Sequence, residues 1–258
     1  MDAVVTAGGI PQPGEPLYEY TQGISKAMLD VAGKPMIQWV LDALSGADQV
    51  DNIVIIGLTE ESGVTSPKIA SFIPNQGGMV DNIRAGVMKT LDINPESVHV
   101  LLVSSDIPTI SSEMVDWLIV TAMETDDEAY YNVISRQVME TRFPGSKRSY
   151  TRLKDLEVCG GDMNLIKTSL VSQDSQIWNK LVAARKNVFK QAALIGYDTL
   201  FLLAFRLVTL EQAVKRASKR LHIKGRAIVC PYAEVGMDVD KPHQLEMVRA
   251  DFARRTAA

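Results

Sequence analysis

The sequence predicts an α/β protein with a doubly wound, mostly parallel sheet. Its first half contains three short, continuously apolar runs, at 3–7, 52–57 and 98–103. Such runs are typical of parallel strands that are covered on both faces. Helical patterns alternate with these runs, and the connections are short. This alternation favours a three-layer αβα architecture.

Three helices are expected in the first half. Residues 34–44 carry Pro35 in the first turn, where its missing N–H costs nothing. Residues 80–91 follow a pair of glycines, and 111–123 begin with serines that can cap a helix. These helices would supply the outer layers of the fold.

The second half changes character. Residues 131–135 and 227–230 are expected strands. The stretch 142–154 is an expected loop, because it is polar and basic and contains Pro144 and Gly145.

Helices are expected in the rest of this half. Residues 176–222 indicate several consecutive helices, an insertion packed against the sheet, and a last helix runs from Pro242 to about Arg254. We expect residues 1–258 to form a single domain, as chains of this length often do.

Bulk composition excludes some function classes. The chain is 46% hydrophobic and 22% charged, which is ordinary for a globular protein. Its formal net charge of −4 argues against nucleic-acid binding, which usually needs a basic surplus. The two cysteines are too few for a disulfide framework, and no charged leader precedes the first apolar run. We therefore expect a cytoplasmic protein that binds no nucleic acid.

The first chemical motif follows the first strand. Ala7-Gly8-Gly9 leads into a long loop that reaches Lys26. Paired glycines let bare backbone N–H groups approach a phosphate, and a lysine can neutralise its charge. Taken alone, the pair is better explained as a tight turn with a surface lysine.

A second glycine pair precedes the helix at 80–91. Gln76-Gly77-Gly78 and Asn82 would place amide groups and a helix N-terminus beside a base or sugar. A plain loop-to-helix cap explains this stretch almost as well.

Aspartates mark two further positions. Asp106 follows a wholly apolar strand, and ligands of open α/β sheets bind at the carboxyl ends of strands. A carboxylate there can hold Mg²⁺ while a triphosphate supplies other ligands. The alternative is that Asp106 caps the next helix. Downstream, we expect Asp240 to cap the last helix, which leaves Asp238 free as a second metal ligand.

Together these motifs resemble the MobA-like NTP transferases, nucleotidyltransferases with a GT-A type sheet. The resemblance covers roughly 2–125 and 227–254, and it includes Gly33-Lys34-Pro35-Met36 at the start of the first long helix. It implies transfer of a nucleoside monophosphate from an NTP to a small phosphorylated acceptor, with release of pyrophosphate. It also implies magnesium held by Asp106 and Asp238, with Lys26 as the phosphate lysine.

The resemblance assigns the binding residues as well. It implies that Ala7, Gly8, Gly9, Lys26, Gln76, Gly77, Gly78 and Asn82 contact the nucleotide. Within the acceptor-side segment of about 130–175, it suggests that Gly161, Asp162 and Asn164 contact the acceptor. The basic residues Lys147, Arg148, Arg152 and Lys154 would close over the acceptor phosphate. A solvated basic loop ahead of a turn explains this stretch about as well.

One departure from the family pattern is clear. Most members carry an arginine between the glycines and the lysine, whereas residues 10–25 contain no basic side chain. Another cation, such as Lys34 or Arg84, would have to take that role, or triphosphate binding would be weaker.

The helical insertion is rich in lysine and arginine. It could touch an anionic membrane surface, form a homodimer contact with Phe201, Leu202, Leu203 and Phe205 buried, or simply present a charged outer face.

Two other functions are compatible with the same fold. A GT-A glycosyltransferase could use Asp238 and Asp240 as its acidic metal motif, and a nucleotide-sensing module could keep the fold without catalysis. The glycine loop with Lys26 favours the nucleotidyltransferase, because an NTP triphosphate needs these groups and a nucleotide sugar does not.

Overall fold

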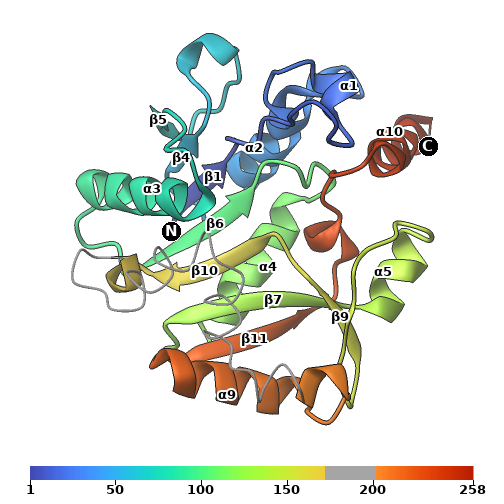
Figure 1. Cartoon of the computed structure of the whole chain (residues 1–258). Coiled ribbons are helices and arrows are strands. Elements are labelled where there is room, and N and C mark those ends of the chain that lie inside the picture. Colours follow the sequence, from blue (N-terminus) through green and yellow to red (C-terminus); the bar gives the residue numbers. More distant parts are fainter. Residues whose placement is uncertain (172–201, 258) are drawn as a thin grey trace.

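The computed structural model describes residues 1–171 and 202–257, and nine of the described strands form one mixed, mostly parallel sheet (Figure 1). The strand order is β5-β4-β1-β6-β10-β7-β9-β8, and β11 pairs with β7 beside this path. The bounds of the strands are β1 Asp2–Thr6, β4 Ile53–Ile56, β5 Ile69–Ile73, β6 His99–Ser104, β7 Ala129–Ser135, β8 Thr151–Arg152, β9 Glu157–Gly160, β10 Met163–Lys167 and β11 Gly225–Cys230.

Helices lie on both faces of this sheet. Their bounds are α1 Tyr18–Thr21, α2 Met36–Gly46, α3 Met79–Ile93, α4 Ser112–Ala122, α5 Arg136–Arg142, α9 Leu210–Leu221 and α10 Pro242–Ala257, with short 3₁₀ turns η1 Lys26–Met28, η2 Glu60–Ser62, η3 Thr168–Val171 and η4 Ala233–Gly236. The predicted α/β class with a mostly parallel sheet is therefore confirmed.

The alternation of side chains along β1 explains the layers. Ala3 and Val5 belong to the large core that includes residues of α2 and α4. Val4 belongs to a second core with Val87 of α3 on the opposite face. Because successive side chains of a strand point to opposite faces, a strand that is apolar throughout needs helices on both sides.

The second half of the sheet contains strands that run against the others. Strand β10 pairs antiparallel with both β6 and β7, and β9 pairs antiparallel with β7. The sequence prediction contained none of β8, β9 and β10, and β8 lies inside the stretch 142–154 that was expected to be a loop. Helix α9 packs on this half through the small core around Val133.

The start of the first long helix also differs from prediction. Helix α2 begins at Met36, because Lys34 and Pro35 pair with Asp30 and Val31 in the small hairpin of β2 (Asp30–Val31) and β3 (Lys34–Pro35). The residues at the turn, Ala32 and Gly33, have φ of 52° and 82°. Two positive φ values are what a tight two-residue hairpin requires.

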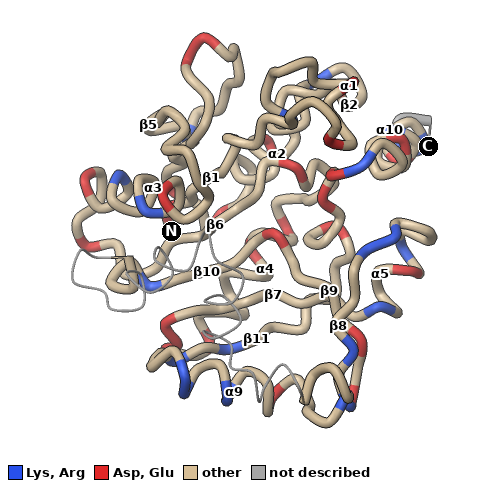
Figure 2. The backbone as a smooth tube through the Cα atoms, viewed as in Figure 1, with Lys and Arg blue, Asp and Glu red and all other residues tan. Residues whose placement is uncertain are grey.

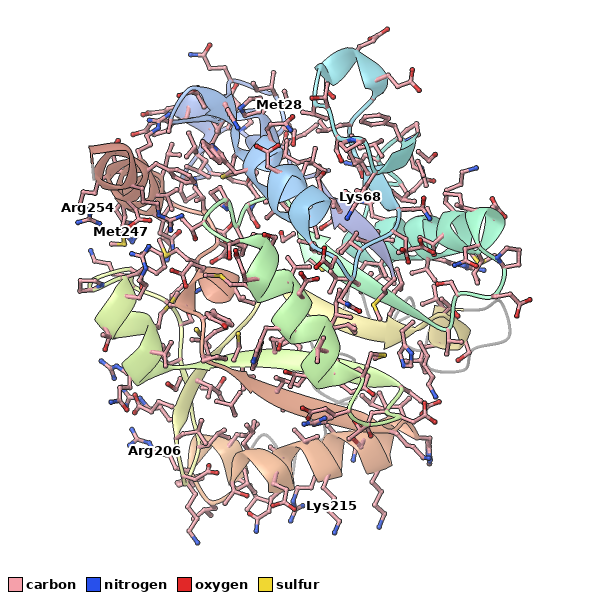
Figure 3. All side chains as sticks on the ribbon, turned by 180° about the vertical axis from the view of Figure 1, so that it is seen from behind. Met28, Lys68, Arg206, Lys215, Met247 and Arg254 are labelled. Carbon is pink, nitrogen blue, oxygen red and sulfur yellow. The ribbon has the colours of Figure 1, made fainter. Side chains whose placement is uncertain are left out.

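Residues 172–201, which include 176–201 of the expected insertion, lie outside the described residues. In the described remainder, Leu202 and Leu203 are half-buried while Phe205 is 63% exposed. Basic residues lie along α9 (Figure 2), and the Lys215 side chain extends from the helix on the side away from the sheet (Figure 3). Across 1–171 and 202–257, no helix has the length and apolar character needed to cross a membrane.

Candidate active site

Strands β1 and β6 end side by side at the same edge of the sheet. The two strands are parallel neighbours, and their register pairs Thr6 with Ser104. Gly8 and Asp106 each lie two residues beyond these ends, so both are at the same edge of the sheet. The predicted placement of ligand-binding residues at the carboxyl ends of strands has this simple geometric origin.

Two hydrogen bonds hold the end of the long loop, at Ser25 and Lys26, against the glycine motif. The Ser25 hydroxyl donates to the carbonyl oxygen of Ala7 at 2.6 Å, and the N–H of Lys26 donates to the carbonyl oxygen of Gly9 at 2.9 Å. A Cβ atom on Gly9 would lie 3.3 Å from Cε of Lys26. The lysine stem therefore runs directly beside the backbone of the glycine loop.

Gly57 is a functional candidate that the sequence analysis missed. It follows β4 with a φ of +101°, and a Cβ atom there would overlap the backbone of Gly8. The glycine loop can thus pass close to the neighbouring strand only because Gly57 has no side chain. The available signal was a glycine as the last residue of the predicted strand 52–57.

Three carboxylates converge at this edge. Asp106, Asp238 and Asp240 can place one oxygen atom each within 4.8 Å of one another. The N–H of Val239 donates to the carbonyl oxygen of Asp106 at 2.9 Å, and this bond joins two segments that are far apart in the sequence. Asp106 and Asp238 are only 4% and 8% exposed. The structure thus brings the two predicted aspartates together.

The expected helix cap at Asp240 is wrong. Helix α10 begins at Pro242, and the carbonyl oxygen of Lys241 accepts the N–H of Leu245 at 3.2 Å. The Asp240 carboxylate instead pairs with Nζ of Lys26 at 2.5 Å. Asp240 is therefore a third acidic member of the site, because its side chain pairs with the half-buried Lys26 and not with a helix terminus.

Lys26 is held as a cation by two carboxylates. Its Nζ atom lies 2.5 Å from Oδ2 of Asp106 and 2.5 Å from Oδ1 of Asp240. Burial alone would lower the pKa of Lys26, but the charges and hydrogen bonds of Asp106 and Asp240 raise it above its ordinary value. At neutral pH Lys26 is a fixed positive charge and no proton acceptor.

The donor set of this cluster fits a magnesium ion. Magnesium prefers oxygen ligands and is commonly held by one or two carboxylates together with substrate phosphates. Asp238 Oδ1 is buried and already faces a cation, the guanidinium of Arg148. With Asp106 and Asp240 it supplies three carboxylates at one place, a donor set that suits a divalent cation.

An asparagine network holds the second glycine pair against the first. Asn75 donates from Nδ2 to the carbonyl oxygen of Gly8 at 2.9 Å, and its Oδ1 accepts the N–H of Gly77 at 2.9 Å. Asn82 accepts the N–H of Gln76 at 2.7 Å. Sequence analysis assigned no role to Asn75, because its partner Gly8 lies beyond the end of another strand.

A cavity of about 400 Å³ lies between these groups. It is lined by Thr6, Gly8, Gly9, Lys26, Asn75, Gly77, Gly78, Met79, Asn82, Ser104, Ser105, Asp106, Asp162, Asp238 and Asp240. Two predicted nucleotide contacts lie elsewhere. The Ala7 side chain belongs to the buried core, and the exposed Gln76 donates from its amide to the carbonyl oxygen of Pro74 at 2.6 Å.

On the acceptor side, the structure places Asp162 in the cavity wall. Burial and the nearby Asp106 raise the pKa of Asp162 to about 7, although Arg148 opposes the shift. Asn164 accepts the N–H of Asn132 at 2.8 Å and donates to the carbonyl oxygen of Gly161 at 2.9 Å. Gly161 and Asn164 thus shape the turn that presents Asp162.

The basic loop contributes one side chain to the site. Arg148 is only 14% exposed; it contacts Asp238 and lies 3.8 Å from Oδ2 of Asp162. The other basic residues of this loop, Lys147, Arg152 and Lys154, are exposed. Lys34, a candidate for the missing loop arginine, is 2.8 Å from Asp42 and is absent from the residues that line the cavity.

Comparisons with known proteins agree with this geometry. The family model described as the MobA-like NTP transferase domain matches residues 3–175. A hypothetical transferase structure from Thermus thermophilus is 30% identical, with a TM-score of 0.80 over 95% of this chain and 98% of the other. No sequence in the curated set of proteins matches significantly.

More distant structures share the fold. A CMP-2-keto-3-deoxy-manno-octonic acid synthetase complexed with CTP has a TM-score of 0.58 at 13% identity, over 99% of this chain and 98% of the other. A 4-diphosphocytidyl-2C-methyl-D-erythritol synthase from Anaerococcus prevotii has a TM-score of 0.59 at 12% identity, over 98% and 95%.

Proposed function

Because the chain belongs to the MobA-like NTP transferase family, we propose that it transfers a nucleoside monophosphate from an NTP to a small phosphorylated acceptor and releases pyrophosphate. The observation that carries this proposal is the meeting of Lys26, Asp106 and Asp238 at a cavity walled by glycine backbone. Its oxygen-rich wall suits a divalent cation, and its glycines suit a triphosphate.

Each group has a defined task in this reaction. The bare backbone at Gly8 and Gly9 lets the triphosphate approach, and Lys26 stabilises the departing pyrophosphate as a permanent cation. Asp106 and Asp238, joined by Asp240, would hold Mg²⁺, which when bound neutralises charge at the α-phosphate and the attacking oxygen. A phosphate nucleophile is already ionised near neutral pH, so catalysis rests on alignment and electrostatics.

The rival functions use the same fold differently. A glycosyltransferase would take a nucleotide sugar, which has no triphosphate for Lys26 to meet. A nucleotide-sensing module would bind NTP without turnover. The glycine backbone and Lys26 in one cavity favour an NTP, and the presence of Asp106 and Asp238 beside them favours catalysis.

The test is turnover by the full chain with Mg²⁺, each of the four NTPs and a panel of sugar and polyol phosphates. We expect pyrophosphate release that depends on both the NTP and one acceptor class. Parallel reactions contain nucleotide sugars, from which release of free nucleoside diphosphate would instead establish a glycosyltransferase. NTP binding without turnover across the whole panel would favour the sensing module.

A further inference from the structure

Arg148 is a cation that lies against the carboxylate cluster. It belongs to the loop between α5 and β8, and its side chain is only 14% exposed. The guanidinium contacts Oδ1 of Asp238 and lies 3.8 Å from Oδ2 of Asp162. Both aspartates line the catalytic cavity. Arg148 therefore faces a carboxylate oxygen that the proposed metal site would use.

Two protein cations divide the cluster between them. Lys26 pairs with Asp106 and Asp240, both at 2.5 Å, whereas Arg148 contacts Asp238. Each of the three carboxylates thus has a counter-charge from the protein itself. A buried carboxylate without such a partner is costly, so these pairs compensate the site while it holds no metal. A divalent cation at the cluster has to compete with at least one of them.

Of the two cations, Arg148 has a second acceptor outside the cluster. Oδ2 of Asp162 is buried and has no hydrogen-bond partner among residues 1–171 and 202–257. Its 3.8 Å distance from the guanidinium is too long for a hydrogen bond, and a small movement of the side chain would close it. A guanidinium has five N–H donors, so it can change acceptors and keep a charged partner.

Lys26 lacks this freedom. Both of its carboxylate partners, Asp106 and Asp240, belong to the cluster itself. Movement of Lys26 away from the cluster would leave two carboxylates without a counter-charge. Displacement of Arg148 from Asp238 to Asp162 leaves none without one, because the incoming metal takes its place.

We propose that Arg148 holds the place of the divalent cation at Asp238 in the metal-free protein and moves to Asp162 when that cation binds. The inference rests on the proposed function, since it concerns the same carboxylate cluster. Asp238 then has a positive partner in both states. The affinity of the site for the free ion is lowered, because the ion has to displace a charge-assisted pair.

The affinity of the full chain for Mg²⁺ alone tests this, measured by titration calorimetry at pH 8, above the pKa of about 7 of Asp162. Arg148→Met should bind Mg²⁺ at least about tenfold more tightly than wild type, because no guanidinium competes for Asp238. An arginine that merely orients Asp238 for the metal predicts the opposite sign. Unchanged or weaker binding in Arg148→Met, or no binding by either protein, would overturn the proposal.

Lys154→Met is the matched control for charge. It removes one positive charge from the same basic stretch, but its side chain is exposed, where solvent screens it. Its affinity for Mg²⁺ should stay within about twofold of wild type. A gain as large as that of Arg148→Met would show that net charge, and not the contact with Asp238, sets the affinity.

The thermal unfolding midpoint without metal checks that each variant is folded, and Arg148→Gln replaces Arg148→Met if the latter unfolds. A second readout needs no variant. Crystal structures of the wild type without and with Mn²⁺, which carboxylates also bind, should place the guanidinium on Asp238 and on Asp162 respectively. A guanidinium still on Asp238 beside the bound ion would refute the exchange.

Failure of this inference is distinguishable from failure of the proposed function. Pyrophosphate release from an NTP tests the reaction, whereas the Mg²⁺ affinity of Arg148→Met tests only the exchange. Turnover by wild type with no gain in affinity in Arg148→Met would keep the function and remove the exchange. The expected gain without turnover would do the reverse.

Discussion

At the scale of single residues, the site is a balance of charge. Three carboxylates face Lys26 and Arg148, and the strongest contacts of Lys26 go to Asp106 and Asp240. Lys26 and Arg148 are two cations, whereas Asp106, Asp238 and Asp240 are three carboxylates and Asp162 is a fourth. The site therefore retains a net negative charge. That surplus is what a divalent ion would offset before a triphosphate enters.

Asp106 carries the first prediction. Asp106→Ala removes a buried carboxylate from the cluster, and the rate of pyrophosphate release with the true acceptor should fall roughly a hundredfold or more. Asp92→Ala on the exposed side of α3 is the control, since Asp92 has only a 3.9 Å pair with Lys89. Near-wild-type turnover in Asp106→Ala would refute the role.

Gly57 carries the second prediction. Gly57→Ala adds a Cβ against the backbone of Gly8 and should weaken NTP binding, measured by calorimetry. Gly63→Ala is a matched control, because Gly63 also has a positive φ, +72°, but nothing lies within 4 Å of its Cβ position. Both changes should cost about 1–2 kcal/mol of stability from backbone strain. If both variants bind NTP equally well, Gly57 is needed only for the backbone conformation of the turn and not for NTP binding.

At the scale of elements, one arginine fastens the segment that carries Asp238. Arg142, at the end of α5, donates from Nε to Glu234 of η4 and from both Nη atoms to Asp251 of α10, all at 2.8 Å. The segment between η4 and α10 contains Asp238 and Asp240. Arg142 thus fixes both ends of a stretch on which the metal-site geometry depends.

Arg142→Met should lower the free energy of unfolding by about 1–3 kcal/mol, because two largely buried carboxylates lose a charged donor. Urea unfolding at pH 7 measures the loss. Arg136→Met on the same helix is the control, since its pair with Glu157 is exposed and should contribute under about 1 kcal/mol. A loss no larger than in the control would contradict the fastening role.

The same contact predicts a pH dependence. Burial alone would raise the pKa of Asp251, but Arg142 and its neighbouring arginines lower it below the ordinary 3.8. A depressed pKa in the folded state contributes stability above pH 3.8, and this is lost as pH falls through the depressed value. Urea midpoints measured from pH 6 downward should therefore fall less steeply in Asp251→Asn than in wild type. Parallel curves would exclude Asp251 as a contributor.

At the scale of the whole molecule, the cluster joins two parts of the chain. Asp106 follows β6 in the first half, whereas Asp238 and Asp240 lie between η4 and α10 near the end. A cation shared by these groups would bind the folded state and not the unfolded chain. Such a ligand stabilises by mass action, by about 2.7 kcal/mol at a concentration a hundredfold above its Kd.

Mg²⁺ should accordingly raise the midpoint of thermal unfolding in wild type, and EDTA should reverse the shift. Asp238→Asn should lose most of this response, because one of three carboxylate ligands becomes an amide. Asp92→Asn should retain it. A magnesium response of wild-type size in Asp238→Asn would show that the ion binds elsewhere.

The sequence by itself determined the layers of the fold and the edge where the site lies. Continuous apolar runs require cover on both faces, and polar residues directly beyond such runs must gather where parallel strands end. Ala7-Gly8-Gly9 and Asp106 were predictable for this reason. Their positions follow from the local sequence pattern alone. Asp238 was predicted from the order of the motifs along the chain.

Only the tertiary structure decided the partners of these groups. Asp240 looks like a helix cap in sequence, yet it faces Lys26, and Arg148 is one of several loop cations until folding buries it beside Asp238. Asn75 likewise acquires its role only when Gly8 arrives from another strand. Contacts between segments remote in sequence depend on strand order and register, and a local pattern of residues encodes neither.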